Sequence, residues 1–125
     1  MLFRSAKVAR WMRDPGLIRH RGKLASVIPN ARVFLALAAE HGSFARWLWT
    51  FVDDRPVVRR GRPLGVSPEA LAISKELRRR GMKFVGPTII HAFLQAVGVY
   101  DEHAEGCFRA KRKKARARVR ARVSR

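Results

Sequence analysis

The clearest pattern of apolar and polar positions lies between residues 67 and 98, where two helical segments flank a short turn. Ser67-Pro68-Glu69 is typical of a helix start, with a hydroxyl cap, an early proline and an acid. Gly81 predicts a left-handed stop, and the second helix begins at once after the turn and ends at Gly98. From the helical period, the buried faces are predicted to be Ala70, Ile73, Ser74 and Leu77 in the first helix, and Ile90, Phe93, Leu94 and Val97 in the second.

The turn between these helices, residues 82–88, is compatible with two interpretations. In the first, unpaired N–H groups of the turn and of the second helix point outward. Together with the positive end of the helix dipole they form a phosphate-binding site. In the second, the segment is a plain pair of antiparallel helices with a glycine stop. The pattern alone leaves both interpretations open.

Three more helices are predicted before this pair. A short basic helix covers residues 6–12, and a turn at residues 14–16 leads into a basic connector, residues 17–23. The next helix, residues 23–39, contains Pro29, which predicts a kink or a new start at that point. Its apolar stripe is predicted at Leu24, Val27, Ile28, Ala31, Leu35 and Ala38.

The third of these helices follows a cap at Ser43 and carries an apolar stripe, with Phe44, Trp47, Leu48 and Phe51 at i, i+3, i+4 and i+7. Such a stripe could line a ligand pocket, but burial tendencies favour a place in the core. Residues 53–66 and 99–107 are rich in turn signals, and no segment of useful length alternates with the period of a strand. The expected fold is therefore all-α.

A change in composition separates residues 1–108, which are expected to form one domain, from residues 109–125. The second segment contains ten Lys or Arg and no acid, and it has few large apolar side chains. Mutual repulsion of these charges predicts a disordered basic tail. Such a tail would add a non-specific, salt-sensitive affinity for polyanions.

The charge of the whole chain indicates the class of partner. The 125 residues include 28 Lys or Arg and 9 Asp or Glu, giving a formal net charge of +19. A chain this basic is expected to bind polyanions, most often nucleic acid. A membrane surface is the weaker alternative, because no apolar run reaches the roughly 18 residues of a spanning helix. The single cysteine excludes an internal disulfide, and the N-terminus lacks the apolar core of a signal peptide, so a cytoplasmic protein is expected.

One pair of residues has the spacing of metal ligands. His103 and Cys107 are four positions apart, which places both side chains on one side of a helical turn, within reach of one zinc ion. A structural zinc site needs four ligands, and this spacing provides two of them. Spacing alone therefore favours a pair without a metal.

Several segments together resemble the DNA-3-methyladenine glycosylase I family, from about Val8 to Phe108. Residues 16–24, Gly-Leu-Ile-Arg-His-Arg-Gly-Lys-Leu, are similar to a signature of that family, and so is Leu-Trp-Thr-Phe-Val at residues 48–52. Residues 74–88 resemble its Ser-Lys-x-Leu-Lys-Lys-Arg-Gly-Phe-Lys-Phe-Val-Gly-x-Thr motif. Residues 103–107 resemble its His-x-x-x-Cys ending. The order and spacing of the four segments make the likeness specific.

The resemblance implies an all-α fold of the helix-hairpin-helix glycosylase superfamily, acting on double-stranded DNA that contains alkylated bases. Such enzymes flip the damaged nucleotide out of the duplex and hydrolyse its N-glycosidic bond during base excision repair. The segment 67–98 becomes the DNA-anchoring hairpin, with phosphate contacts expected from Lys83, Phe84, Val85, Gly86 and Thr88. Arg19, Arg21 and Lys23 are expected to line the DNA-facing rim, to order the connector through hydrogen bonds to carbonyl groups together with His20, or to do both.

The resemblance also implies a structural zinc ion, held by His103, Cys107 and a Cys and a His near the family's N-terminus. Those two N-terminal ligands have no counterpart here, so only two of the four are present. The family's pocket glutamate, flanked by tryptophan and tyrosine, has no counterpart either, and no catalytic residue is named. We therefore expect an N-terminally truncated, incomplete glycosylase-like bundle that is monomeric, and its activity as a partial chain is left open. The alternatives are a non-catalytic helix-hairpin-helix DNA-binding protein and, third, a basic RNA-associated protein.

Overall fold

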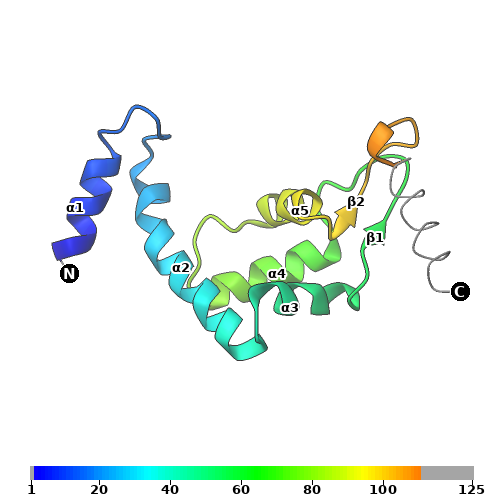
Figure 1. Ribbon diagram of the computed structural model, residues 1–125, viewed down its shortest axis with the longest axis horizontal. Helices are drawn as coiled ribbons and strands as arrows, with labels where there is room; N and C mark the ends of the chain where they lie inside the picture. Colours follow the sequence, from blue (N-terminus) through cyan, green and yellow to red (C-terminus); the bar gives the residue numbers. More distant parts are fainter. Residues whose placement is uncertain (1, 111–125) are drawn as a thin grey trace, which may run out of the picture.

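The computed structural model describes residues 2–110, and the side chains of residues 6–110. The basic segment 111–125, most of the expected tail, lies outside the described residues. Five α-helices make up most of the described chain (Figure 1). They are α1 (Leu2–Trp11), α2 (Arg21–His41), α3 (Phe44–Trp49), α4 (Pro68–Arg79) and α5 (Pro87–Ala96), and a short 3-10 helix, η1 (Thr50–Val52), extends α3. The predicted all-α fold is confirmed. No helix among the described residues is long and apolar enough to cross a membrane.

The hydrophobic core lies between the C-terminal part of α2 and the helices α3, α4 and α5. Leu37 of α2 is buried there with Trp47 and Leu48 of α3. All four residues predicted for the inner face of α4 are buried. The aromatic stripe of α3 is in the core as predicted: Phe44, Trp47 and Phe51 are in ring contact, with centroids 5.2 Å apart in each successive pair. Serine hydroxyls cap both helices as expected, since Ser43 and Ser67 accept from the N–H groups of Arg46 and Ala70.

The buried positions of α2 differ from those predicted from its sequence. Leu35 and Val27 are exposed, whereas Ser26 and Leu37 are buried. The reason is that α2 carries apolar residues on more than one side, and only its C-terminal part packs against α3. α2 is also longer than predicted and runs without a restart through Pro29. A proline removes one intrahelical hydrogen bond and its ring crowds the carbonyl four residues earlier, but the helical bonds on either side keep α2 continuous here.

Two two-residue strands were not predicted. β1 (Val57–Val58) pairs in parallel with β2 (Tyr100–Asp101), and the N–H of Val57 donates to the carbonyl of Val99 at 2.8 Å. The pair joins the loop after η1 to the segment after α5 (Figure 1). Strands this short leave no alternation in the sequence. Next along the chain, residues 108–110 form a helical turn in which Ala110 is buried, although residues 109 and 110 were assigned to the tail.

The face of α5 is also more polar than the period predicts. Ile90 and Leu94 are buried as expected, but Phe93 and Val97 are exposed. His91 is buried instead, on the side that faces the loop before α4. This side chain contacts both Ser67 and Glu102, so a polar cluster completes the inner face of α5.

Candidate nucleic-acid interface

The hairpin between α4 and α5 contains two residues with left-handed backbone. Gly81, with φ of 95°, ends α4 in the way its sequence predicts. Phe84 also has a positive φ, of 59°, a conformation that glycine adopts readily and a side chain disfavours by about 1 kcal/mol. The phenylalanine therefore remains in this conformation only because contacts on both sides fix the hairpin.

Two side chains hold the hairpin on either side of Phe84. The carboxamide of Asn30, on α2, accepts from the N–H of Lys83 and donates to its carbonyl, both at 2.9 Å. The Ser74 hydroxyl, on α4, donates to the carbonyl of Val85 at 2.6 Å. The hairpin is thus fixed to two helices at once. Sequence reasoning missed Asn30, although an asparagine inside a helix is a weak sign that its side chain has another task.

Phe84 lies against the first turn of α2. Its ring meets the His20 imidazole edge-on, with 5.7 Å between the centroids. A Cβ atom on Gly22 would lie 3.3 Å from Cζ of Phe84, so glycine at this position lets the ring approach closely. The exposed residues Arg21 and Lys23 flank this contact in sequence. The structure therefore brings together the two groups of predicted DNA-binding residues, which are about 60 residues apart in the chain.

His20 has a defined structural role beside this contact. Its Nδ1 accepts from the N–H of Lys23 at 3.1 Å and caps α2, which begins at Arg21 rather than at Lys23. The imidazole thus bonds to an amide N–H, not to a carbonyl as one interpretation of the connector expected. The guanidinium of Arg19 and the charged groups of Arg21 and Lys23 belong to exposed residues and are accessible to a ligand.

The N-terminus of α5 offers backbone donors. Gly86 occupies the cap position without a side-chain cap, and its carbonyl accepts from Ile90 at 2.9 Å. The N–H groups of Thr88 and Ile89 precede that first intrahelical bond, so α5 itself gives them no acceptor. Of the predicted contacts, Lys83, Phe84 and Thr88 are exposed, whereas the Val85 side chain packs against the core.

An open cleft of about 550 Å³ lies beside this helix start, between α4 and α5. Two of its lining side chains are cationic, Lys75 and Arg78, and both residues are exposed. The Nη2 atom of Arg78 would lie 3.5 Å from a Cβ on Gly86. Two cations and the positive end of the α5 dipole therefore meet at one place, which suits an anion. Sequence reasoning missed both residues, although their i, i+3 spacing puts them on one side of α4.

The polar cluster around His91 holds α5 in place. Its ring nitrogens lie 3.1 Å from the Ser67 hydroxyl and 2.9 Å from Glu102. The Glu102 carboxylate also accepts from the N–H of Leu64 and from Gln95. Burial raises the pKa of Glu102, but these hydrogen bonds outweigh burial and leave its pKa below the usual value. The cluster joins α5, the loop before α4 and the segment after β2.

His103 and Cys107 lie close together, with 3.8 Å between Nδ1 and Sγ. That separation is compatible with two corners of a zinc tetrahedron, given Zn–N and Zn–S bonds of roughly 2.1 and 2.3 Å. Nowhere in residues 2–110 do three or more His, Cys, Asp or Glu side chains converge on a metal position. Cys107 is the one cysteine of the sequence, while His20 and His91 are engaged as described above. The residues present thus do not fit a four-ligand zinc site.

Comparisons with known proteins agree with this architecture. The sequence profile of the methyladenine glycosylase family matches residues 1–110. The chain is 40% identical to DNA-3-methyladenine glycosylase 1 of Escherichia coli strain K12, over 80% of this chain and 56% of that protein. It is 37% identical to a DNA-3-methyladenine glycosylase of Haemophilus influenzae, over 77% of this chain and 54% of that protein.

Solved structures give the same result. A structure of 3-methyladenine DNA glycosylase I from Staphylococcus aureus, which addresses recognition of 3-methyladenine, superposes with a TM-score of 0.79 at 31% identity. The superposition covers 83% of this chain and 57% of that one. The chain thus spans little more than half the length of these relatives. Because the family profile covers nearly all of the chain and the helices superpose, the chain belongs to the methyladenine glycosylase family.

Proposed function

We propose that this chain acts in base excision repair as a DNA-3-methyladenine glycosylase, removing alkylated adenine from DNA. The observation that carries the proposal is the family match over residues 1–110, together with superposition on a glycosylase that recognises 3-methyladenine. In the reaction, the bond between the sugar carbon C1′ and the base nitrogen breaks, and the base leaves with the bonding electrons. A water oxygen forms a new bond to C1′ and loses one proton to solvent, which leaves a hydroxyl on the sugar. Because 3-methyladenine carries a positive charge, it is already a good leaving group.

The part of this reaction that the described residues support is the binding of double-stranded DNA. We propose that α4, the hairpin and α5 form a helix-hairpin-helix anchor. In it, the N–H groups of Thr88 and Ile89 donate to a backbone phosphate. Lys75 and Arg78 neutralise that phosphate from the cleft beside α5. A second, adjacent set of cations extends the contact to neighbouring phosphates: Lys83, Arg19, Arg21 and Lys23. These contacts would position the duplex without reading its sequence.

No side chain of the described chain is assigned to bond cleavage. Enzymes of this class act on a nucleotide that has been flipped out of the duplex into a pocket. Phe84 is exposed at the tip of the hairpin, but it lies on the anchoring side and has no group that activates water. The step that the described residues support is therefore the holding and orienting of the DNA.

For zinc, the proposal is limited to His103 and Cys107. When a structural zinc is bound, these two side chains would provide two of its four ligands, and neither residues 1–5 nor residues 111–125 contain a Cys, His, Asp or Glu that could complete the set. A zinc ion there would stabilise the end of the domain and would take no part in bond cleavage. We further propose that the protein is a monomer and that it acts in the cytoplasm.

Two assays on the full chain separate this function from its alternative, a non-catalytic DNA-binding protein. The first measures release of 3-methyladenine from methylated duplex DNA, and the second measures retardation of unmodified duplex in a gel. We expect both release and retardation. Retardation without release would favour the non-catalytic alternative, and the absence of both would overturn the DNA-binding assignment as well.

A further inference from the structure

Phe84 places an aromatic ring at a position where glycine would fit without strain. Its φ of 59° lies in the left-handed region, which glycine adopts readily and a side chain disfavours. The residue is 48% exposed, so burial of the ring offsets only part of that conformational cost. A strained backbone conformation that its surroundings maintain is a sign that the residue has a function of its own.

The hairpin is held by bonds in which the ring of Phe84 takes no part. Both backbone groups of Lys83 bond to the Asn30 carboxamide, and the carbonyl of Val85 accepts from the Ser74 hydroxyl. These bonds lie on either side of Phe84 in the chain and would remain if its side chain were removed. The ring is therefore not needed to close the hairpin and is available to a ligand.

The start of α2 supports the tip of this ring. Its Cζ atom lies 3.3 Å from the place that a Cβ on Gly22 would occupy, and the His20 imidazole lies beside it, with 5.7 Å between the ring centroids. Nearly half of the surface of Phe84 remains open beyond these contacts. A ring that is fixed at its tip and exposed elsewhere is already oriented for binding, which reduces the entropy lost when a ligand covers it.

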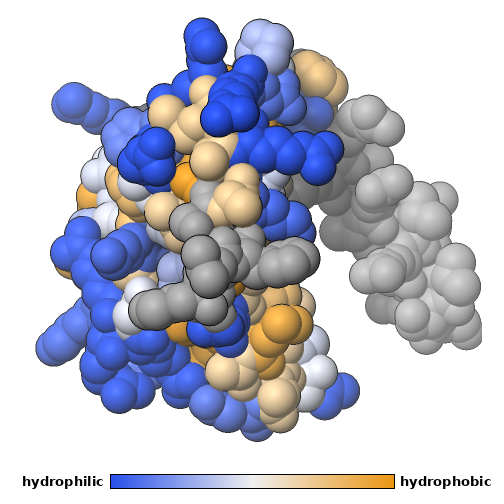
Figure 2. Space-filling view, turned by 90° about the vertical axis from the view of Figure 1, so that its left-hand side faces the viewer, coloured by the Kyte–Doolittle hydropathy of each residue, from blue (hydrophilic) through white to orange (hydrophobic). Residues whose placement is uncertain are grey.

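The ring lies near the place where the start of α5 suits an anion. Phe84 precedes Gly86, the cap of α5, by two residues, so their Cα atoms are at most about 7 Å apart. On the other side, Nη2 of Arg78 would lie 3.5 Å from a Cβ on Gly86. Figure 2 shows hydrophilic side chains over much of the side on which α1 and α2 lie, in a chain with a net charge of +19. The ligand that meets the ring is therefore expected to be a polyanion.

We propose that the Phe84 ring packs on the deoxyribose of the nucleotide next to the phosphate that is held at the start of α5. In a duplex the base faces are stacked on one another and the phosphates are charged, so the C–H groups of the sugars are the apolar surface of the backbone. A phenyl ring cannot form the hydrogen bonds that read base edges, and a sugar contact carries no sequence information. The inference rests on the proposed DNA anchor and adds to it a contact without charge.

The test measures, by titration calorimetry, the binding of the full chain to unmodified duplex DNA and to inorganic polyphosphate, which has phosphates but no sugars. Phe84→Gly and Phe84→Asn both remove the ring, and both residue types tolerate the left-handed conformation. Each variant should bind the duplex about fivefold more weakly, the lower end for an aromatic contact with a nucleotide. Binding of polyphosphate should stay unchanged. The slope of log duplex affinity against log salt should also stay unchanged, because no charge is lost.

Phe108→Asn is the matched control, because it makes the same replacement at a residue that is 65% exposed and does not belong to the hairpin. It should bind both ligands like the wild type, and melting followed by circular dichroism checks that all three variants fold. Equal losses of affinity for duplex and polyphosphate would overturn the inference, since the ring would then only support the hairpin. Unchanged duplex affinity in both Phe84 variants would overturn it as well. If the wild-type chain does not bind duplex DNA, the proposed function itself fails and the inference falls with it.

Discussion

Asn30 on α2 and Lys83 in the hairpin are joined by a pair of hydrogen bonds, each 2.9 Å long, across 53 positions of sequence. One carboxamide thereby satisfies both the N–H and the carbonyl of the same residue. These two bonds fix the backbone next to Phe84, whose positive φ needs support from other residues. It also sets the distance between the basic start of α2 and the start of α5. The geometry of the proposed DNA anchor thus depends on an uncharged side chain.

The first prediction is that Asn30→Ala weakens DNA binding more than it weakens the fold. Both bonds are open to solvent, although Asn30 itself is half-buried, so their loss should lower the free energy of unfolding by about 1 kcal/mol. Release of the hairpin should reduce duplex affinity several-fold, measured by anisotropy at fixed salt. Asn30→Asp retains an acceptor for the Lys83 N–H and should keep part of the affinity. If both variants bind DNA like the wild type, the hairpin is positioned by other contacts.

The second prediction concerns the cations of the cleft beside α5. If Lys75 and Arg78 each contact one phosphate, alanine at either position should lower the slope of log affinity against log salt by about 1. The affinity should fall alike for duplexes of different sequence, because phosphate contacts do not read bases. Arg55→Ala makes the same charge change on an exposed loop residue that does not line the cleft, and it should leave the slope unchanged. If the Lys75, Arg78 and Arg55 variants all give the same slope, the DNA does not bind at this cleft.

The sequence predicted α4 best, and the reason is physical. Its polar and apolar positions alternate cleanly with the helical period, so Ala70, Ile73, Ser74 and Leu77 were all identified as buried. The caps at Ser43 and Ser67 and the stop at Gly81 were likewise predicted, because each depends on residues within one helical turn.

The contacts that build the candidate site could not be predicted in the same way. The bond from Asn30 to Lys83 and the contact of His20 with Phe84 join segments far apart in the chain. No local pattern encodes such pairs. On α2, apolar residues occur on several sides, so the period alone could not show which side the other helices would cover. Packing against the other helices buries Leu37 and leaves Leu35 exposed.

That difference gives a third prediction. Leu37 is completely buried, whereas Leu35 is 65% exposed on the same helix. Leu37→Ala should lower the free energy of unfolding by about 3 kcal/mol, because it removes buried methyl groups and leaves a cavity. Leu35→Ala should change it by no more than about 0.5 kcal/mol. Urea unfolding followed by Trp fluorescence measures both values. Similar losses in the two variants would mean that α2 faces the core with a different side.

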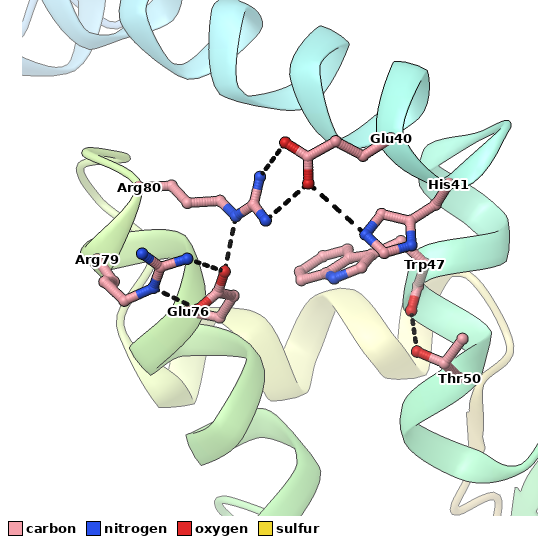
Figure 3. Close-up of polar contacts among 7 residues, drawn as sticks. All are labelled: Glu40, His41, Trp47, Thr50, Glu76, Arg79 and Arg80. Carbon is pink, nitrogen blue, oxygen red and sulfur yellow. Dashed lines mark hydrogen bonds and ion pairs between the residues drawn. The ribbon is translucent and has the colours of Figure 1, made fainter.

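The last prediction follows from the ion pairs that connect the ends of α2 and α4. Glu76 accepts from Arg79 and Arg80, and Arg80 also donates to Glu40 at 2.7 and 2.8 Å (Figure 3). The hydrogen bonds from Arg79 and then Arg80 lower the pKa of Glu76 to about 2. In the unfolded chain this carboxyl returns to its ordinary pKa, near 4.5.

Between these two values the unfolded state binds more protons than the folded state, so stability rises with pH across this interval. The contribution of Glu76 is complete above about pH 4.5 and disappears as the pH falls to about 2. Glu76→Gln should therefore be less stable than the wild type at pH 6, by about 1 kcal/mol, the upper end for exposed ion pairs. The two proteins should converge near pH 2. Glu105→Gln changes an exposed carboxylate outside this network and serves as the control. A wild-type advantage that persists undiminished at pH 2 would show that the Glu76 charge is not its source.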